Sequence, residues 1–497
     1  MGDRARNQPL SVSRRVGASL ALLAVLSSCG GGGSSGGGGG GAVVVPPPAP
    51  TPPPPPPPPP TAAACSLRDR QDWAAAQLNE WYLFPELMTA GLNPDNFSSV
   101  QAYIDALVAP ARAQNKDRFY TFVTSLATDS AFFSAGTSAG LGARLSIDAA
   151  ARRLFISEAF EDAPALAAGL DRGTEILAIG TGAADLKTVD AIILAEGSDG
   201  VAAALGPNTA GTARLLRVRE LSGTVRDVTV TKAPYTVAAV SSRYGAKILD
   251  DGGKKVGYLN LRTFIQAADP QLRNAFAQFR AQGVAEVIVD LRYNAGGLLA
   301  TAELISNLLL GQRSPTDVMQ YRVHRPSKAN FDFTRLFAPQ PQSVSATKVA
   351  FISTADTGSA SEVVMNSVIP YLGANTAMIG ANTYGKPVGQ VFLDRPACDD
   401  RMKVIAFVTQ NSQKQGDYFN GIASKFQKTC AAADDLTRPF GDPLEGSVKS
   451  ALDFLAGRPC GSAIAGDPAA KAGKAPAGEL VTPALPNALQ RELPGVF

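Results

Sequence analysis

The sequence predicts a multidomain α/β protein that combines a small N-terminal helical region, a β-rich module and an α/β core. Its 497 residues exceed the ~250–300 residues that one hydrophobic core supports, so two or three domains are expected. Hydrophobic residues make up 45% and charged residues 18% of the chain, which is ordinary for globular domains. Between residues 239 and 460, strands of near-continuous Val and Ile alternate with helices, which is typical of parallel strands covered on both faces.

Residues 1–28 have the organisation of a targeting segment. A basic stretch precedes the apolar run VGASLALLAVL, which is shorter than the ~20 residues that span a bilayer. The run ends in LSSC, Leu26 to Cys29, the pattern of a bacterial lipoprotein signal whose cleavage would leave Cys29 lipidated. An ordinary secretory signal with an incidental cysteine is the alternative. Gly30 replaces the aspartate associated with inner-membrane retention. We therefore expect export and lipid anchoring in a bacterial envelope, facing the periplasm, with the outer membrane favoured.

Residues 29–64 form a low-complexity tether in which a glycine-rich part precedes a proline-rich part. The glycine part is a flexible coil and the proline part a stiff spacer, so the tether would hold the body away from the membrane. A neutral low-complexity insertion is the alternative. Residues 1–28 contain four Arg and one Asp, so the remaining chain carries 42 basic and 42 acidic residues. No basic run with interleaved aromatic residues occurs in the sequence, so no nucleic-acid partner is expected.

Four cysteines follow the tether, and an even number in an exported protein suggests disulfides. They are Cys65, Cys398, Cys430 and Cys460, which allow three pairings. We favour Cys398 with Cys430 and Cys65 with Cys460, because the second pair would join the start of the folded body to its end. No CxxC pair or Cys/His cluster suggests a metal, and no cofactor is expected.

The body divides into four segments by pattern. Residues 65–135 are expected to form a helical region, from stretches such as DRQDWAAAQLNEWYLF. Residues 136–238 carry short strand patterns such as RLFISEAF, with helices expected at APALAAGL and VDAIILAEG. Residues 239–460 form the α/β core, and residues 461–497, rich in small residues, are expected to be disordered.

Within the core, helices and strands alternate in a regular order. Strands are expected at KVGYLNLRTF, VAEVIVDLR and TKVAFIST, and strand ends with loops at MIGANTYGK and KVIAFVTQ. Helices are expected at PQLRNAFAQFRAQG, GGLLATAELISNLLLG and ASEVVMNSVIPYLG. The last helix follows the stretch TADTGSASE, which contains the first candidate for chemistry.

Ser359 starts this helix, and two interpretations compete for it. Ser359 and Glu362 match the S-x-x-E capping box, so the serine could simply cap the helix. At a strand–helix junction, however, a serine lies at the carboxyl end of a strand, where α/β sheets place ligands. The free N–H groups of the first helical turn suit an oxyanion. The chain has one histidine, His324, so a nucleophilic Ser359 needs another base.

Two further stretches supply the missing groups. DLRYNAGGLL contains a Gly-Gly turn, Gly296 and Gly297, that can bring backbone N–H groups close to a ligand; a tight structural turn is the alternative. TYGKPVGQ places Lys386 among glycines and apolar residues. A desolvated lysine can lose its proton and act as general base to a serine, whereas a solvated loop lysine is the usual alternative.

In this order, VIVDLRYNAGG, TGSASEVV and NTYGKPVGQ resemble the signatures of the carboxyl-terminal processing (tail-specific) serine proteases. The resemblance runs from about Arg118 to Gln390 and implies a crotonase-like α/β peptidase core. It implies Ser359 as nucleophile, Lys386 as base and Gln390 as its partner.

The same resemblance implies that the oxyanion donors are the N–H groups of Ala360 and of Gly297 rather than Gly296. The spacing from serine to lysine is slightly longer than in the family, near PYLGANTA, which leaves the subgroup open.

The family also carries a PDZ domain before the peptidase core, and residues 136–238 resemble one. GLGARL occupies the place of the carboxylate-binding loop, which implies peptide binding by Gly140, Leu141, Gly142 and Ala143. PDZ domains capture C-termini by strand addition. The helix–turn–strand segment DAPALAAGLDRGTEILAIGTG also matches, except that IGTG stands where VNG is common.

The expected function is a Ser/Lys endopeptidase that cleaves exported or misfolded proteins and selects them by C-terminus through the PDZ-like module. One alternative is a catalytically silent, membrane-tethered PDZ scaffold that binds peptides. Another is an acyl-CoA hydratase or hydrolase, whose superfamily shares a related core and a glycine oxyanion hole. That alternative leaves the PDZ-like module and the lipoprotein signal unexplained.

Overall fold

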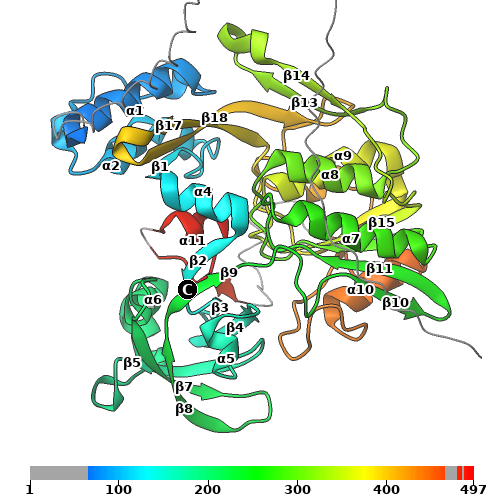
Figure 1. Ribbon diagram of the computed structural model, residues 1–497, viewed down its shortest axis with the longest axis horizontal. Helices are drawn as coiled ribbons and strands as arrows, with labels where there is room; N and C mark the ends of the chain where they lie inside the picture. The colour runs from blue at the N-terminus through cyan, green and yellow to red at the C-terminus, as the bar shows by residue number, and fades with distance from the viewer. Residues whose placement is uncertain (1–64, 465–477, 484–485) are drawn as a thin grey trace, which may run out of the picture. The chain divides into compact units, whose positions relative to one another are not determined.

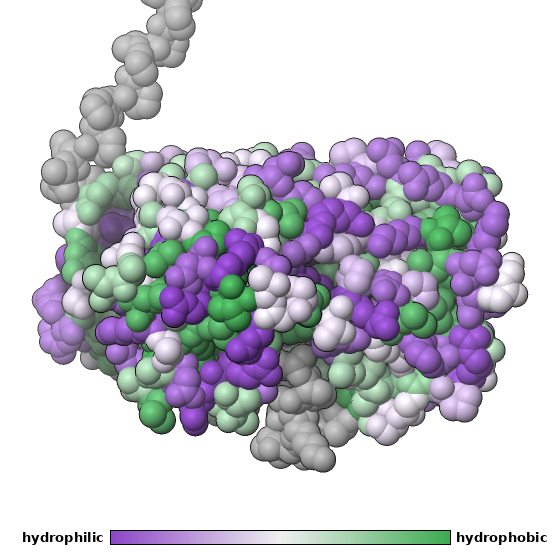
Figure 2. Space-filling view, turned by 90° about the horizontal axis from the view of Figure 1, so that it is seen from below, coloured by the Kyte–Doolittle hydropathy of each residue, from purple (hydrophilic) through white to green (hydrophobic). Residues whose placement is uncertain are grey.

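The computed structural model describes residues 65–464, 478–483 and 486–497 (Figure 1). The expected signal peptide, the lipidation site Cys29 and the tether therefore lie outside the described residues. The described residues all belong to one compact unit, residues 59–497. None of their helices has both the length and the apolar character that crossing a membrane requires. On the face shown in Figure 2, hydrophilic and hydrophobic residues are interspersed.

The N-terminal region is mainly helical, with one short strand before its last helix. It contains α1 (Leu67–Trp81), α2 (Val100–Leu107), α3 (Ala109–Ala113), β1 (Phe122–Ser125) and α4 (Leu126–Ala135). Ser66 caps α1 by accepting the N–H of Asp69 at 3.2 Å. The expectation of an all-helical region was wrong for β1, which pairs antiparallel with a strand of the core. Four residues are too few to carry a periodic signal, so only the partner strand defines β1.

The β-rich module, residues 136–238, forms as expected. It contains β2 (Thr137–Gly140), β3 (Ala143–Asp148), β4 (Arg153–Ala159), α5 (Pro164–Ala167), β5 (Glu175–Gly180), β6 (Lys187–Thr188), α6 (Val189–Leu205), β7 (Ala213–Arg219), β8 (Val225–Thr231) and β9 (Ala233–Thr236). Its sheet has the order β20-β3-β4-β5-β7-β8, in which β20 (Glu479–Leu480) comes from the end of the chain; β6 lies beside β5, while β2 and β9 form a separate pair. The two expected helices correspond to α5 and α6.

The α/β core is built on a sheet whose central strands are parallel. The order is β10-β11-β12-β15-β16-β19, and every pair from β11 to β19 is parallel. The elements are β10 (Lys247–Asp251), β11 (Lys254–Asn260), α7 (Ala268–Ala281), β12 (Glu286–Asp290), α8 (Leu299–Leu309), β15 (Lys348–Ser353), α9 (Ala360–Leu372), β16 (Thr376–Gly380), β19 (Thr429–Ala431) and α10 (Gly446–Leu455). The sequence pattern of buried strands and helices is thereby confirmed.

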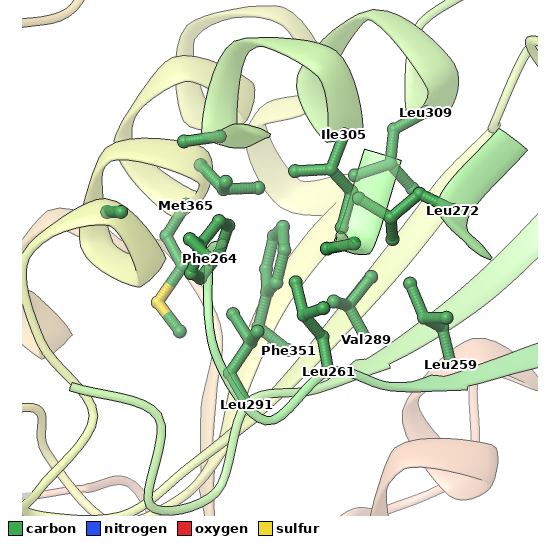
Figure 3. Close-up of a cluster of buried hydrophobic side chains, with 14 of the residues drawn as sticks. Leu259, Leu261, Phe264, Leu272, Val289, Leu291, Ile305, Leu309, Phe351 and Met365 are labelled. Carbon is green, nitrogen blue, oxygen red and sulfur yellow. The ribbon is translucent and has the colours of Figure 1, made fainter. Parts of the chain in front are cut away.

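Helices cover both faces of this sheet. On one face, Leu272, Ile305 and Met365 from α7, α8 and α9 pack against the strand residues Val289 and Phe351 (Figure 3). On the other face, α10 packs through a separate apolar cluster that contains residues of β12, β15 and β16. Burial on both faces is what the near-continuous Val and Ile runs indicate.

A second, antiparallel sheet was not expected from the sequence. It contains β1, β13 (Val318–His324), β14 (Phe333–Leu336), β17 (Val388–Arg395) and β18 (Asp400–Gln410), in the order β1-β18-β13-β14 with β17 on β18. Of these strands, the sequence analysis expected only a strand end, at KVIAFVTQ, which is part of β18. Because β17 begins two residues after Lys386, Gln390 lies on a strand that fixes its position relative to the lysine.

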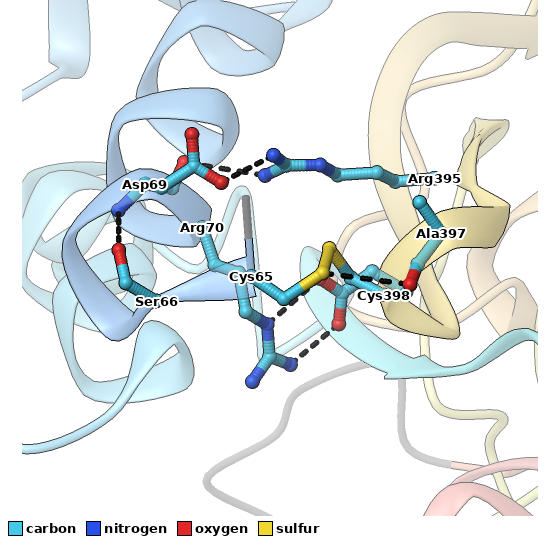
Figure 4. The surroundings of a disulfide bond; sticks show 8 residues. Cys65, Ser66, Asp69, Arg70, Arg395, Ala397 and Cys398 are labelled. Carbon is cyan, nitrogen blue, oxygen red and sulfur yellow. Dashed lines mark hydrogen bonds and ion pairs between the residues drawn. A yellow bond between two sulfur atoms is a disulfide. The ribbon is translucent and has the colours of Figure 1, made fainter. Parts of the chain in front are cut away.

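The disulfide pairing differs from the one that the sequence analysis favoured. The bonds are Cys65–Cys398 and Cys430–Cys460, so the favoured pairs Cys398–Cys430 and Cys65–Cys460 were wrong. Cys65 lies just before α1 and contacts the turn that joins β17 to β18, where its Sγ lies 3.4 Å from the oxygen of Ala397 (Figure 4). The β17–β18 hairpin brings Cys398 to the N-terminal region, and the sequence did not reveal that hairpin.

The end of the chain is ordered where the structure describes it. Residues 478–483 and 486–497, called the returning segment below, contain β20 (Glu479–Leu480) and α11 (Ala488–Glu492). The expectation of a disordered tail over 461–497 was wrong for these residues. Val481, Leu493, Val496 and Phe497 are all buried, and their burial against the rest of the protein orders the segment.

Candidate active site

Ser359 lies in a sharp turn between β15 and α9. Its backbone has φ 54° and ψ −117°, whereas a residue that caps a helix normally has β-region angles. A positive φ is costly for a residue other than glycine and clusters at functional sites. Strained strand-to-helix turns of this kind present nucleophilic serines in other α/β folds. The conformation of Ser359 therefore differs from that of an ordinary helix cap.

Glu362 joins the serine turn to the lysine loop. Its buried carboxylate accepts the N–H of Ser359 at 2.9 Å, of Lys386 at 2.7 Å and of Gly385 at 2.8 Å. The Thr383 hydroxyl donates to the same carboxylate at 2.5 Å. Burial raises the pKa of Glu362, while these hydrogen bonds act in the opposite direction. The sequence analysis treated Glu362 only as a capping residue, since nothing in S-x-x-E points to the lysine loop.

Lys386 is held with its amine aimed at Gln390. Its Nζ donates to Oε1 of Gln390 at 2.9 Å, and Nε2 of Gln390 donates to the oxygen of Tyr120 at 2.5 Å. Burial lowers the pKa of Lys386 to about 8; Lys403 also lowers it, whereas Glu492 raises it. A substantial fraction of the amine is thus neutral slightly above neutral pH, as a general base requires.

The Gly-Gly turn lies directly against the serine. Gly296 and Gly297 have φ of 110° and 132°, and a Cβ on Gly296 would lie 2.7 Å from Cβ of Ser359. The N–H of Gly296 already donates to Oδ1 of Asn294 at 2.9 Å. In contrast, within the described part of the chain the N–H groups of Gly297 and Ala360 have no hydrogen-bond partner. These two donors are free to bind a developing negative charge.

One cavity of about 410 Å³ connects these groups. Ser359, Lys386, Gln390 and Gly297 line it together with residues of the N-terminal region and of the returning segment. His324 does not line it. Across the described residues, no group of three or more His, Cys, Asp or Glu side chains could hold a metal. The cavity is thus lined by a serine, a lysine with a lowered pKa and Gly297, which has a free N–H donor.

The four expected peptide-binding residues lie elsewhere, in the β-rich module. Gly140 ends β2, Ala143 begins β3, and Leu141 and Gly142 connect them. They do not line the catalytic cavity. Gly142 and Ala143 form main-chain hydrogen bonds with Phe497 of the returning segment, whereas the oxygen of Leu141 accepts the N–H of Ala165.

Comparisons with known proteins point to one family. Residues 255–417 match the model of peptidase family S41. The carboxyl-terminal-processing protease of Picosynechococcus sp. is 26% identical over 261 residues, which is 52% of this chain and 57% of that protein. The protein of the same name from Synechocystis sp. is 26% identical over 254 residues, 50% of this chain and 53% of that protein. This chain therefore spans little more than half the length of these relatives.

Among solved structures, a candidate S41 protease from Bacteroides fragilis has a TM-score of 0.59 at 24% identity. The likeness covers 78% of this chain and 97% of that one, and shows a shared mixed α/β fold. The matched residues 255–417 include the Gly-Gly turn, Ser359, Lys386 and Gln390. Through residues 255–417, the core matches peptidase family S41, and the chain is similar to carboxyl-terminal-processing proteases.

Proposed function

We propose that this chain is a serine endopeptidase in which Ser359 and Lys386 form the catalytic pair. The observation that carries the proposal is the shared cavity, which both side chains line. Glu362 fixes the backbone of both residues, and Gln390 holds the lysine amine. A serine and a base fixed in one cavity, with the base desolvated, are what nucleophilic catalysis without histidine requires.

In the proposed reaction, neutral Lys386 accepts the hydroxyl proton of Ser359 as Oγ attacks the scissile carbonyl carbon. The N–H groups of Ala360 and Gly297 stabilise the tetrahedral oxyanion. The C–N bond then breaks, and protonated Lys386 gives its proton to the leaving amine, which leaves an acyl-enzyme. Lys386 next accepts a proton from water as the water attacks the ester, and the proton passes to Oγ of Ser359 when the acid is released. Gln390 keeps the amine oriented throughout.

We further propose that the β-rich module works as a PDZ-like domain that takes protein C-termini. Its edge strand β3 follows the glycine-containing loop Gly140–Ala143 and already pairs with extended chain on its open side. Strand addition of this kind is how PDZ domains bind peptides. With a lipid anchor at Cys29, such an enzyme would act on exported or misfolded proteins at the membrane, the outer membrane in an organism that has one.

The test is cleavage of an unfolded protein that has an apolar C-terminus. Wild-type chain should cleave it, and Ser359→Ala and Lys386→Ala should each lose the activity. His324→Gln is the matched control, because this histidine lies off the cavity, and it should cleave at the wild-type rate. Cleavage that persists in Ser359→Ala would reject this serine as nucleophile. A wild-type chain that binds peptides but cleaves none would instead support the silent scaffold.

A further inference from the structure

The returning segment occupies the peptide-binding edge of the β-rich module. The N–H of Gly142 donates to the oxygen of Phe497 at 2.8 Å, and the N–H of Phe497 donates to the oxygen of Ala143 at 3.0 Å. The N–H of Leu145 donates to the oxygen of Gly495 at 2.8 Å. Residues 495–497 thus run antiparallel to β3, beside the loop that was expected to bind substrate C-termini.

The side chains of this stretch fill defined positions. Phe497 is 2% exposed and belongs to the same buried apolar cluster as Leu141, Val201 and Leu205. Gly495 has φ 78°, and a Cβ there would lie 3.1 Å from Cγ of Arg144. The groove therefore accepts an aromatic side chain at the position of Phe497 and prefers glycine two residues earlier.

The same segment continues into the wall of the catalytic cavity. Gln490, Arg491 and Glu492 from the region of α11 line the cavity with Ser359 and Lys386. In Figure 1, α11 (red) lies directly beside α4. Leu489 and Leu493 are buried in the main core cluster.

Polar contacts hold α11 in this position. Glu492 accepts from Nζ of Lys403 at 2.8 Å, and the Arg491 guanidinium lies 4.7 Å from the ring centre of Phe122. One stretch of chain therefore fills the peptide groove and also closes part of the cavity.

We propose that the returning segment is an internal ligand of the β-rich module, which keeps the protein self-inhibited until a competing peptide displaces it. The competing peptides are those that carry a glycine, an apolar residue and an aromatic residue in this order, the pattern of Gly495, Val496 and Phe497. The inhibition of cleavage rests on the proposed function. The binding of the returning segment in the groove does not, and it can be tested by itself.

Binding is measured on the chain carrying Ser359→Ala, so that no probe is cleaved. The probe is a fluorescent synthetic peptide with the sequence of residues 487–497 and a free carboxylate. Phe497→Asp puts a charge into the apolar cluster, so it should release the segment and strengthen probe binding at least tenfold. Leu444→Asp puts the same charge on an exposed side chain away from the groove; it is the matched control and should bind the probe as weakly as the parent. Equal dissociation constants in all three chains would overturn the proposal, as would a failure of all three to bind.

A second measurement needs no tail variant. Hydrogen exchange of the peptide that covers residues 486–497 should be slow in the parent chain and at least tenfold faster with millimolar probe. A probe with alanine in place of its Gly495 equivalent should have at least a fivefold weaker effect. Unchanged exchange at saturating probe would overturn the proposal even if Phe497→Asp proved unstable.

The catalytic consequence is read separately, with Ser359 intact. Phe497→Asp should cleave an unfolded protein at least fivefold faster than the parent or Leu444→Asp. Tighter probe binding with no cleavage by any chain would reject the proposed protease and retain the internal ligand. Cleavage at equal rates with equal probe affinities would retain the protease and reject the internal ligand.

Discussion

At the scale of single residues, the chemistry depends on the protonation of Lys386. The lysine owes its lowered pKa mainly to burial, which disfavours the ammonium form. Its hydrogen bond to Gln390 fixes the amine without supplying a negative charge. A carboxylate in place of Gln390 would favour the ammonium and make the base ineffective at neutral pH.

The first prediction concerns pH. Since the base is the neutral amine and its pKa is about 8, kcat/KM should fall about tenfold per unit below pH 8 and level off above it. The measurement is a pH profile of peptide cleavage from pH 6 to 10, with circular dichroism at each pH as control. A flat profile would exclude Lys386 as the base.

The second prediction concerns Glu362. In Glu362→Gln, an NH₂ group replaces one carboxylate oxygen. The backbone N–H groups that this oxygen accepted then have no acceptor, so the serine turn and the lysine loop should move apart. Misplacement of reacting groups by ~1 Å can cost ~10² in rate, so kcat should fall about 10²-fold with little change in KM.

Steady-state kinetics check this expectation. Glu303→Gln is the control, because Glu303 is a buried carboxylate on α8 that pairs with Arg322 and does not line the cavity. This variant should keep its kcat. An unchanged kcat in Glu362→Gln would leave Glu362 with only a capping role.

At the scale of elements, the two disulfides fasten different parts of the fold. Cys65–Cys398 ties the start of α1 to the β17–β18 hairpin across 333 residues, and Cys430–Cys460 ties β19 to the chain beyond α10 across 30 residues. The hairpin also carries Gln390. The longer link thus supports the strand whose Gln390 accepts a hydrogen bond from Lys386.

The third prediction compares the two bonds. Loop-closure entropy predicts that the longer link stabilises the fold by roughly 2 kcal/mol more than the shorter one. The pair Cys65→Ser and Cys398→Ser should therefore lower the urea midpoint more than the pair Cys430→Ser and Cys460→Ser. Both variants are compared with oxidised wild type. The opposite order would show that local packing outweighs loop length.

At the scale of the whole molecule, buried ion pairs connect the β-rich module to the core. Arg172 of the module and Arg292 of the core both bind the carboxylate of Asp434. Tyr293, which precedes the Gly-Gly turn, also donates to Asp434. Burial raises the pKa of the Asp434 carboxyl, but the two guanidinium groups outweigh burial and lower it to about 2.

The fourth prediction follows from this depressed pKa. The folded-state pKa of Asp434 is about 2 against about 3.9 when unfolded, so its contribution of roughly 2–3 kcal/mol is present above pH 4 and lost as pH falls toward 2. Asp434→Asn should lower Tm at pH 6, and the difference from wild type should shrink toward pH 2. Asp227→Asn, at a half-exposed surface pair, is the control and should change Tm little. A constant difference across this range would contradict the assignment.

Much of the α/β core and its candidate site could be predicted from local sequence. The hydrophobic pattern indicates which faces of the strands and helices are buried. Runs of Val and Ile between amphipathic helices therefore predicted the parallel sheet. Ser359 was identified because a strand, a small-residue turn and a helix are adjacent in the chain. Lys386 and Gln390 were identified through family motifs.

The rest depended on partners distant in sequence. Hydrophobic periodicity indicates which positions of a segment are buried, but it does not indicate which distant residues they contact. For this reason β1, the β17–β18 hairpin and the link from Glu362 to the lysine loop were missed. Cysteine spacing does not specify pairing, because the fold decides which sulfur atoms meet.

The sequence alone determined the alternation of buried strands and helices and the strand–turn–helix succession at Ser359, because these depend on neighbouring residues. Only the tertiary structure decided which cysteines pair and that the returning segment lies along β3. Gly495, Val496 and Phe497 have no periodic pattern, and their order comes entirely from β3 and the apolar cluster that receives them.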